Sequence, residues 1–161
     1  MTVASRTEIR SFVDRETPYT LAAEASFARR IEAIRGWRLQ KLGGSYSPDY
    51  AIYKRNLCKG WLEVKCRYGQ KWNQYPTYMV GVKKWEKCMA LANTPGIQMP
   101  FLLAVCVDDG DFIMNCSAAI AKGMAVVVRP GGRVDRDWVE DLEPCVYIPK
   151  QHFARLHHDR F

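Results

Sequence analysis

Three charged side chains in a strand-like stretch, residues 47–67, are of types that could carry out chemistry. Asp49 follows Ser-Pro, and Glu63 and Lys65 flank Val64 fourteen residues further on. Two neighbouring carboxylates repel each other unless a proton or a cation lies between them. Carboxylate oxygens favour Mg²⁺ or Mn²⁺ over zinc. The pattern therefore predicts a divalent-metal site with an amine beside it.

A predicted hairpin would bring these side chains together. Residues 49–54 and 60–68 alternate as strands do, and residues 55–60 are expected to connect them. Successive side chains in a strand point to opposite faces, so Glu63 and Lys65 share one face while the residue between them points into the core. If the two strands pair, Asp49 lies close to Glu63 on that face.

The remaining hydrophobic pattern predicts an α/β domain. A length of 161 residues fits one domain, with a core at about 17–107 and additions at 108–161. Helical spacing and strand-like alternation give the order α-β-β-β-α-β, a mixed central sheet flanked by helices. The expected elements are a helix at 21–34, strands at 37–42, 49–54 and 60–68, a helix at 77–92, a buried central strand at 100–107, strands at 112–118 and 124–130, and a last strand followed by a short helix within 146–156.

The two motifs together resemble those of the PD-(D/E)XK nuclease superfamily, which has a restriction-endonuclease-like core. Ser-Pro-Asp at 47–49 and Glu-Val-Lys at 63–65 occur in the superfamily's order and spacing, and the predicted α-β-β-β-α-β order is that of its core. Glu24, on the first predicted helix, resembles the additional acidic residue of the family. The resemblance covers roughly residues 20–107 and is closest to small Holliday-junction resolvases and phage-encoded nucleases.

The resemblance implies a role for each of these residues. Asp49, Glu63 and the Val64 carbonyl would bind Mg²⁺ or Mn²⁺, and no organic cofactor is expected. Lys65 would orient or activate the attacking water. Glu24 would shape the site or help to bind a second metal. The implied activity is metal-dependent hydrolysis of DNA by an endonuclease, with branched or junction DNA as a candidate substrate. The alternative is an inactive nucleic-acid-binding or assembly module that keeps the fold.

The charge of the chain favours DNA as the partner. With 24 basic and 17 acidic residues the net charge is +7, which favours a polyanion, with nucleic acid ahead of an anionic membrane. Candidate contacts follow the Glu-Val-Lys strand or lie on the second helix: Arg67, Lys71, Trp72, Tyr75 and Lys83. Trp72 and Tyr75 could instead pack their loop onto the sheet. Of Lys83 and Lys84, one could face the site, although a helix lysine is usually solvated.

Cysteine use and hydropathy bear on location and assembly. The six cysteines form no C-x-x-C pair, and no apolar run approaches the roughly 20 residues that span a bilayer. We therefore expect reduced thiols and a cytoplasmic protein, in the host cytoplasm if it is phage-encoded, with no membrane partner. A branched substrate needs two cuts, which favours a homodimer with two sites.

Overall fold

The computed structural model describes residues 17–44, 46–131 and 142–157, which form two sheets and three α-helices. The larger sheet has the order β1-β2-β3-β5-β6-β9, and the smaller has the order β4-β8-β7. The elements of the larger sheet are β1 (Arg38–Lys41), β2 (Tyr50–Lys54), β3 (Leu57–Arg67), β5 (Phe101–Val107), β6 (Gly110–Asn115) and β9 (Ala154–Arg155). The smaller sheet contains β4 (Thr77–Gly81), β7 (Val127–Gly131) and β8 (Glu143–Pro149); the helices are α1 (Pro18–Arg35), α2 (Val82–Ala92) and α3 (Cys116–Ala121), with 3-10 turns η2 (Trp72–Gln74) and η4 (Lys150–His152).

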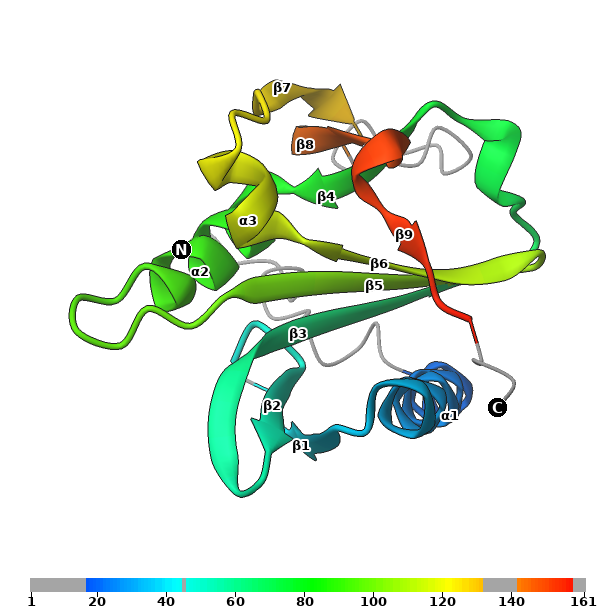
Figure 1. Cartoon of the computed structure of the whole chain (residues 1–161). Helices are drawn as coiled ribbons and strands as arrows, with labels where there is room; N and C mark the ends of the chain where they lie inside the picture. The colour runs from blue at the N-terminus through cyan, green and yellow to red at the C-terminus, as the bar shows by residue number, and fades with distance from the viewer. Residues whose placement is uncertain (1–16, 45, 132–141, 158–161) are drawn as a thin grey trace, which may run out of the picture.

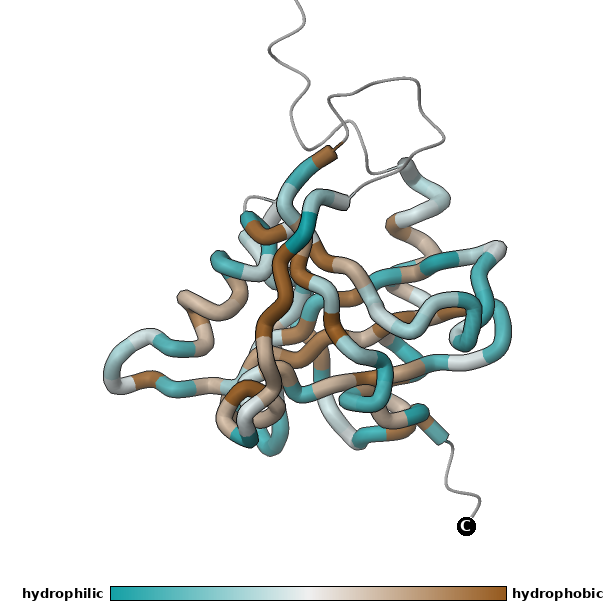
Figure 2. Tube along the Cα trace, turned by 90° about the horizontal axis from the view of Figure 1, so that it is seen from above, coloured by the Kyte–Doolittle hydropathy of each residue, from teal (hydrophilic) through white to brown (hydrophobic). Residues whose placement is uncertain are grey.

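The elements form layers on the two faces of the larger sheet. Helix α1 covers one face, and the smaller sheet with α2 and α3 covers the other (Figure 1). Each face has its own apolar core, one built on α1 and the other on α2, β4 and β8. In Figure 2 the hydrophobic residues follow the inner strands, and the hydrophilic ones lie in the connecting loops. Among the described residues, no helix is both long and apolar enough to cross a membrane.

Helix α1 has clear start and stop signals in the sequence. The Thr17 side chain accepts a hydrogen bond from the backbone N–H of Thr20, and Pro18 occupies the first turn. Gly36 ends the helix in the left-handed conformation, with φ of 64°. The predicted helix at 21–34 is thus confirmed and extended at both ends.

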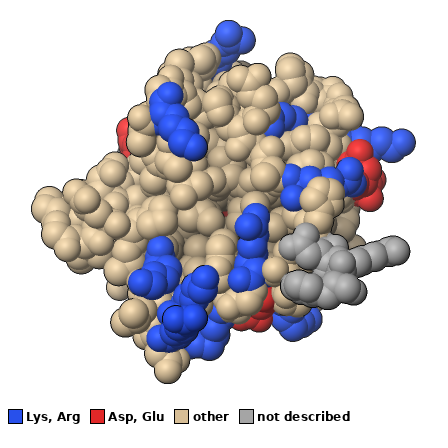
Figure 3. All heavy atoms as spheres, viewed as in Figure 1, with Lys and Arg blue, Asp and Glu red and all other residues tan. Residues whose placement is uncertain are grey.

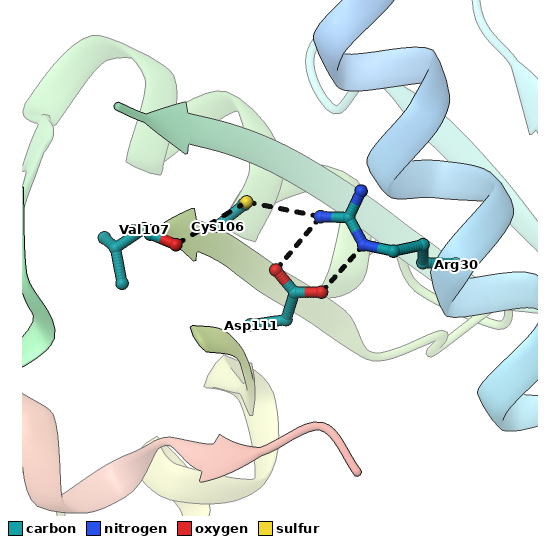
Figure 4. A network of polar contacts seen from close by, with 4 residues as sticks. All are labelled: Arg30, Cys106, Val107 and Asp111. Carbon is teal, nitrogen blue, oxygen red and sulfur yellow. Dashed lines mark hydrogen bonds and ion pairs between the residues drawn. The ribbon is translucent and has the colours of Figure 1, made fainter. Parts of the chain in front are cut away.

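A polar network links helix α1 to the larger sheet (Figure 4). The Arg30 guanidinium donates to both carboxylate oxygens of Asp111 on β6, at 2.9 and 3.1 Å. It also donates to the Cys106 Sγ on β5, at 3.3 Å. The three groups join α1 to the two strands beneath it.

The β2–β3 hairpin is tighter than the sequence indicated. Arg55 and Asn56 alone form the turn, with φ of 50° and 61°, and the ladder continues to Lys54 paired with Leu57. Positive φ at both central residues is what a two-residue turn between twisted strands requires. The expected connection over 55–60 is therefore wrong, because β3 already begins at Leu57.

Strand β3 lies inside the larger sheet. It pairs with β2 in the antiparallel sense and with β5 in the parallel sense, in register from Trp61 with Phe101 to Arg67 with Val107. Strand β5 is buried along its whole length, which confirms the prediction of a central strand. Because both faces of the sheet are covered, Glu63 and its neighbours on β3 face a second core rather than solvent.

Three further expectations about secondary structure are wrong in whole or in part. Residues 77–81 form strand β4 and not the start of a helix, because Tyr78 and Val80 bury one face of the segment while its backbone pairs with β8. The strand predicted at 112–118 ends at Asn115, whose side chain accepts from the Ala118 N–H and caps α3. The strand and short helix expected within 146–156 are present as β8 and the 3-10 helix η4, but β8 is not the last strand, because β9 follows and pairs with β6.

The thiol prediction agrees with the structure. All six cysteines lie in the described residues, and none forms a disulfide. Four of them are buried.

Candidate active site

Asp49 lies immediately before β2 and opposite Glu63. Tyr50 pairs with Leu62, so the next position along the hairpin places Asp49 across from Glu63. The Asp49 Oδ2 accepts a hydrogen bond from the Val64 N–H at 3.0 Å, and Oδ1 lies 3.6 Å from the Lys41 Nζ. Burial opposes ionisation of Asp49, but nearby ammonium groups, led by Lys65, and the Val64 N–H hold its pKa below the usual value.

Glu63 is the buried centre of the site. Its residue exposure is 0%, and its Oε1 lies 2.7 Å from the Lys65 Nζ and also contacts the Lys84 Nζ. Its Oε2 is buried and has no hydrogen-bond or ion-pair partner in the described part of the chain. Burial raises the pKa of Glu63, against the effect of the lysines. A fully buried carboxylate oxygen without a partner is costly unless a ligand uses it.

The Lys65 ammonium is held in its charged form. Burial alone would lower its pKa, but the carboxylates of Glu63 and Asp49 raise the pKa above its usual value. With the side chains in this arrangement, Lys65 is a hydrogen-bond donor and a positive charge. It is suited to orienting a water or a phosphate oxygen rather than to accepting a proton.

Glu24 approaches the site from α1. It lines a cavity of about 380 Å³ that is bordered by Lys41 and Tyr50. Burial raises the pKa of Glu24, and the charge of Asp49 raises it further. Within the described residues, no three Asp, Glu, His or Cys side chains converge as a metal-binding group. Glu24 is thus near enough to Asp49 for their charges to interact, but it lines the cavity under α1, and its role in the site is still a prediction.

The predicted nucleic-acid contacts lie in different environments. Trp72 stacks on Phe112, with ring centroids 3.9 Å apart, and meets Phe153 edge-on, so its ring packs η2 onto the larger sheet. Tyr75 is 55% exposed. Lys71 and Lys83 are exposed, and Arg67 is half-buried at the end of β3. For Trp72 the structure favours the packing alternative.

Lys84 is the site residue that the sequence left undecided, because either Lys83 or Lys84 could have faced the site. Lys83 was the lysine included among the candidates, but it is Lys84 that contacts Glu63. Residues four apart on a helix share a face. The position of Lys84, four residues before the buried Cys88, is the signal that could have distinguished it.

A comparison with protein families matches nearly the whole chain. The family described as "Phage putative PDDEXK endonuclease" matches residues 12–156, a range that contains every element from α1 to β9. The chain belongs to this family. Its two sheets and flanking helices are accordingly a restriction-endonuclease-like α/β fold. A search of curated proteins and a search of solved structures each gave no match.

The donor atoms fit the hard divalent cation that PDDEXK nucleases generally use. The buried and unpartnered Glu63 Oε2 lies opposite Asp49, and the set contains no sulfur or nitrogen ligand. Oxygen-only sets of this kind suit Mg²⁺ and Mn²⁺. Asp49, Glu63 and the Val64 carbonyl are the groups that would hold the ion. When bound, such an ion lowers the pKa of a coordinated water and offsets the charge on a phosphate.

Proposed function

We propose that this PDDEXK family member is an endonuclease that hydrolyses phosphodiester bonds in DNA with Mg²⁺ or Mn²⁺. The observation that carries the proposal is the pairing of Asp49 with Glu63 across the hairpin, with one buried Glu63 oxygen unpartnered and Lys65 bound to the other. A cation at Oε2 would supply the partner that this oxygen lacks among the described residues.

Each residue of the site has a separate role in the proposed reaction. Asp49 and Glu63 supply carboxylate oxygens for the ion, and the hydrogen bond from the Val64 N–H fixes the Asp49 side chain. The Lys65 ammonium orients the attacking water and stabilises negative charge on the phosphate. Glu24 shapes the edge of the site next to Lys41.

Surface charge supports DNA as the substrate. In Figure 3 the Lys and Arg side chains gather over the β1–β2 part of the molecule. Exposed basic residues on β1 and around the β2–β3 turn are Arg38, Lys41, Lys54, Arg55 and Lys59. Lys71, Tyr75 and Lys83 are exposed, and Arg67 half-buried, where they could contact the phosphate backbone. Preference for junction DNA, and the homodimer that two cuts would favour, are further parts of the proposal.

Cleavage of defined substrates tests the proposal. Supercoiled plasmid, linear duplex and a Holliday junction would each be incubated with Mg²⁺ and the wild type, Asp49→Asn or Glu63→Gln. Glu86→Gln, an exposed position on α2, is the matched control. We expect cleavage by the wild type and the control and none by the two site variants.

Some results of the cleavage assay would contradict the proposal, and others would favour a binding module. If the wild type cuts none of the substrates, or if Glu63→Gln cuts as well as the wild type, the proposal is wrong. Tight DNA binding without cleavage and without a metal effect would instead identify a binding or assembly module. Sedimentation of the protein with and without the junction would test the dimer.

A further inference from the structure

The Lys84 side chain links the buried carboxylate to the outside of the site. Lys84 is in the first turn of α2, a different element from the β2–β3 hairpin that carries the other site residues. Its ammonium contacts the Glu63 Oε1, yet its side chain is 26% exposed while that of Glu63 is 1% exposed. The Lys84 ammonium is therefore positioned by Glu63, and its side chain is still partly accessible from solvent.

Two lysines contact the same oxygen of Glu63. Lys65 approaches Oε1 from β3 and Lys84 approaches it from α2, so the contact with Lys84 is additional to the ion pair that Glu63 already forms on its own strand. Lys84 also lies close enough to Asp49 to favour its ionised form. The Lys84 ammonium thus contacts Glu63, lies near Asp49 and is on a side chain that is partly exposed, so an anion in solvent would be attracted to it.

The two oxygens of Glu63 have separate surroundings. Both lysines contact Oε1, whereas Oε2 has no partner in the described part of the chain. A lysine that competed with a cation would be expected on the same oxygen that the cation uses. Here the lysines leave Oε2 available, so they can remain bound while the carboxylate serves another ligand.

From this arrangement we propose that Lys84 is a second catalytic lysine, which binds a nonbridging oxygen of the scissile phosphate while Glu63 holds it in place. The proposal rests on the proposed nuclease function and adds a phosphate-binding residue to that site. Lys65 lies on β3 and Lys84 lies on α2, so they approach the site from different elements. Lys65 can then orient the attacking water while Lys84 binds the phosphate oxygen. A preorganised donor aimed at developing charge is worth about 10²-fold in kcat.

The first test measures DNA binding without cleavage. The affinity for a duplex would be measured in Ca²⁺ over a range of salt concentrations for the wild type, Lys84→Met and Lys87→Met. Lys87 is exposed on the same helix and loses the same charge. Removing one phosphate contact should lower the slope of log K against log salt by about 0.9. We expect this decrease in Lys84→Met alone; equal slopes in the two variants would overturn the proposal.

The second test separates a phosphate contact from a structural role. Lys84→Met should lower kcat about 10²-fold, while the Mn²⁺ affinity measured by calorimetry stays the same or increases, because a positive charge near the cation is lost. A purely structural lysine would lower kcat and Mn²⁺ affinity together, and that result would overturn the proposal. Lys84→Arg, which keeps the charge, should retain most of the salt slope. Lys84→Gln replaces Lys84→Met if the latter does not fold.

The tests separate this inference from the nuclease proposal. A wild type that binds DNA through Lys84 but does not cleave it would contradict the nuclease function and leave the phosphate contact supported. If the wild type cleaves DNA and Lys84→Met binds and cleaves DNA equally well, the nuclease function would be supported and the phosphate contact of Lys84 contradicted.

Discussion

Breaking the contact between Arg30 and Asp111 should loosen α1 by a measurable amount. The two hydrogen bonds, at 2.9 and 3.1 Å, form a bidentate pair between the helix and β6. Hydrogen bonds to charged groups contribute about 1.5–3 kcal/mol, whereas exposed ion pairs contribute about 0.2–1 kcal/mol. The Arg30 side chain is 37% exposed and that of Asp111 is 18% exposed, so the pair belongs between these ranges. We therefore expect a coupling free energy of about 1–1.5 kcal/mol.

A double-mutant cycle isolates this coupling. The free energy of unfolding in urea would be measured for the wild type, Arg30→Met, Asp111→Asn and the double variant. Each single variant also loses contacts of its own, such as the Arg30 hydrogen bond to the Cys106 Sγ, and the cycle removes those contributions. For a domain of this size, a loss of 1 kcal/mol lowers Tm by about 2–4 °C.

The cycle can refute the reasoning directly. A coupling free energy below about 0.3 kcal/mol, the usual deviation from additivity, would mean that the pair contributes nothing to the docking of α1. Unchanged unfolding slopes across the four proteins would be the control, because the slope reports the surface exposed on unfolding.

Three further predictions concern the hairpin, the first helix and the metal site. Gly60→Ala should lower the free energy of unfolding by about 1–3 kcal/mol in urea, because an added Cβ would lie 2.8 Å from the Pro100 carbonyl oxygen; unchanged stability would contradict the close approach. Thr17→Ala should cost about 1 kcal/mol by removing the acceptor for the Thr20 N–H, and a loss of helical circular dichroism at equal temperature would accompany it. Mn²⁺ at 100 times its Kd should stabilise the wild type by about 2.7 kcal/mol, raising Tm by about 5–11 °C in a thermal melt; an equal rise in Asp49→Asn would exclude Asp49 as a ligand.

Local sequence signals were sufficient for the parts of the site that lie on the hairpin. The side-chain alternation of β3 and the short distance along the chain between Asp49 and Glu63 led directly to their pairing, and the register of the hairpin agrees with it. Helix α1 was equally predictable, because its cap at Thr17 and its end at Gly36 depend on residues within a few positions.

The second helix could not be placed from local signals. Residues 77–81 have apolar side chains that fit a helical stripe as well as a strand, and the partner that decides between them, β8, begins more than sixty residues later. The error moved the start of α2 and so concealed which lysine faces the site. The burial of Glu63 escaped notice for the same reason, since the second core over β3 is assembled from β4, α2 and β8.

The C-terminal strands contribute to both sheets. Strand β8 lies between β4 and β7, β9 extends the larger sheet beyond β6, and Leu156 is buried in the core beneath α1. A chain cut after Val107 would leave β4 and β5 with bare edges that invite aggregation, and would withdraw the support that fixes the start of α2. The shortest chain that folds should therefore extend to β9, and progressive truncation from the C-terminal side should find no shorter folded form.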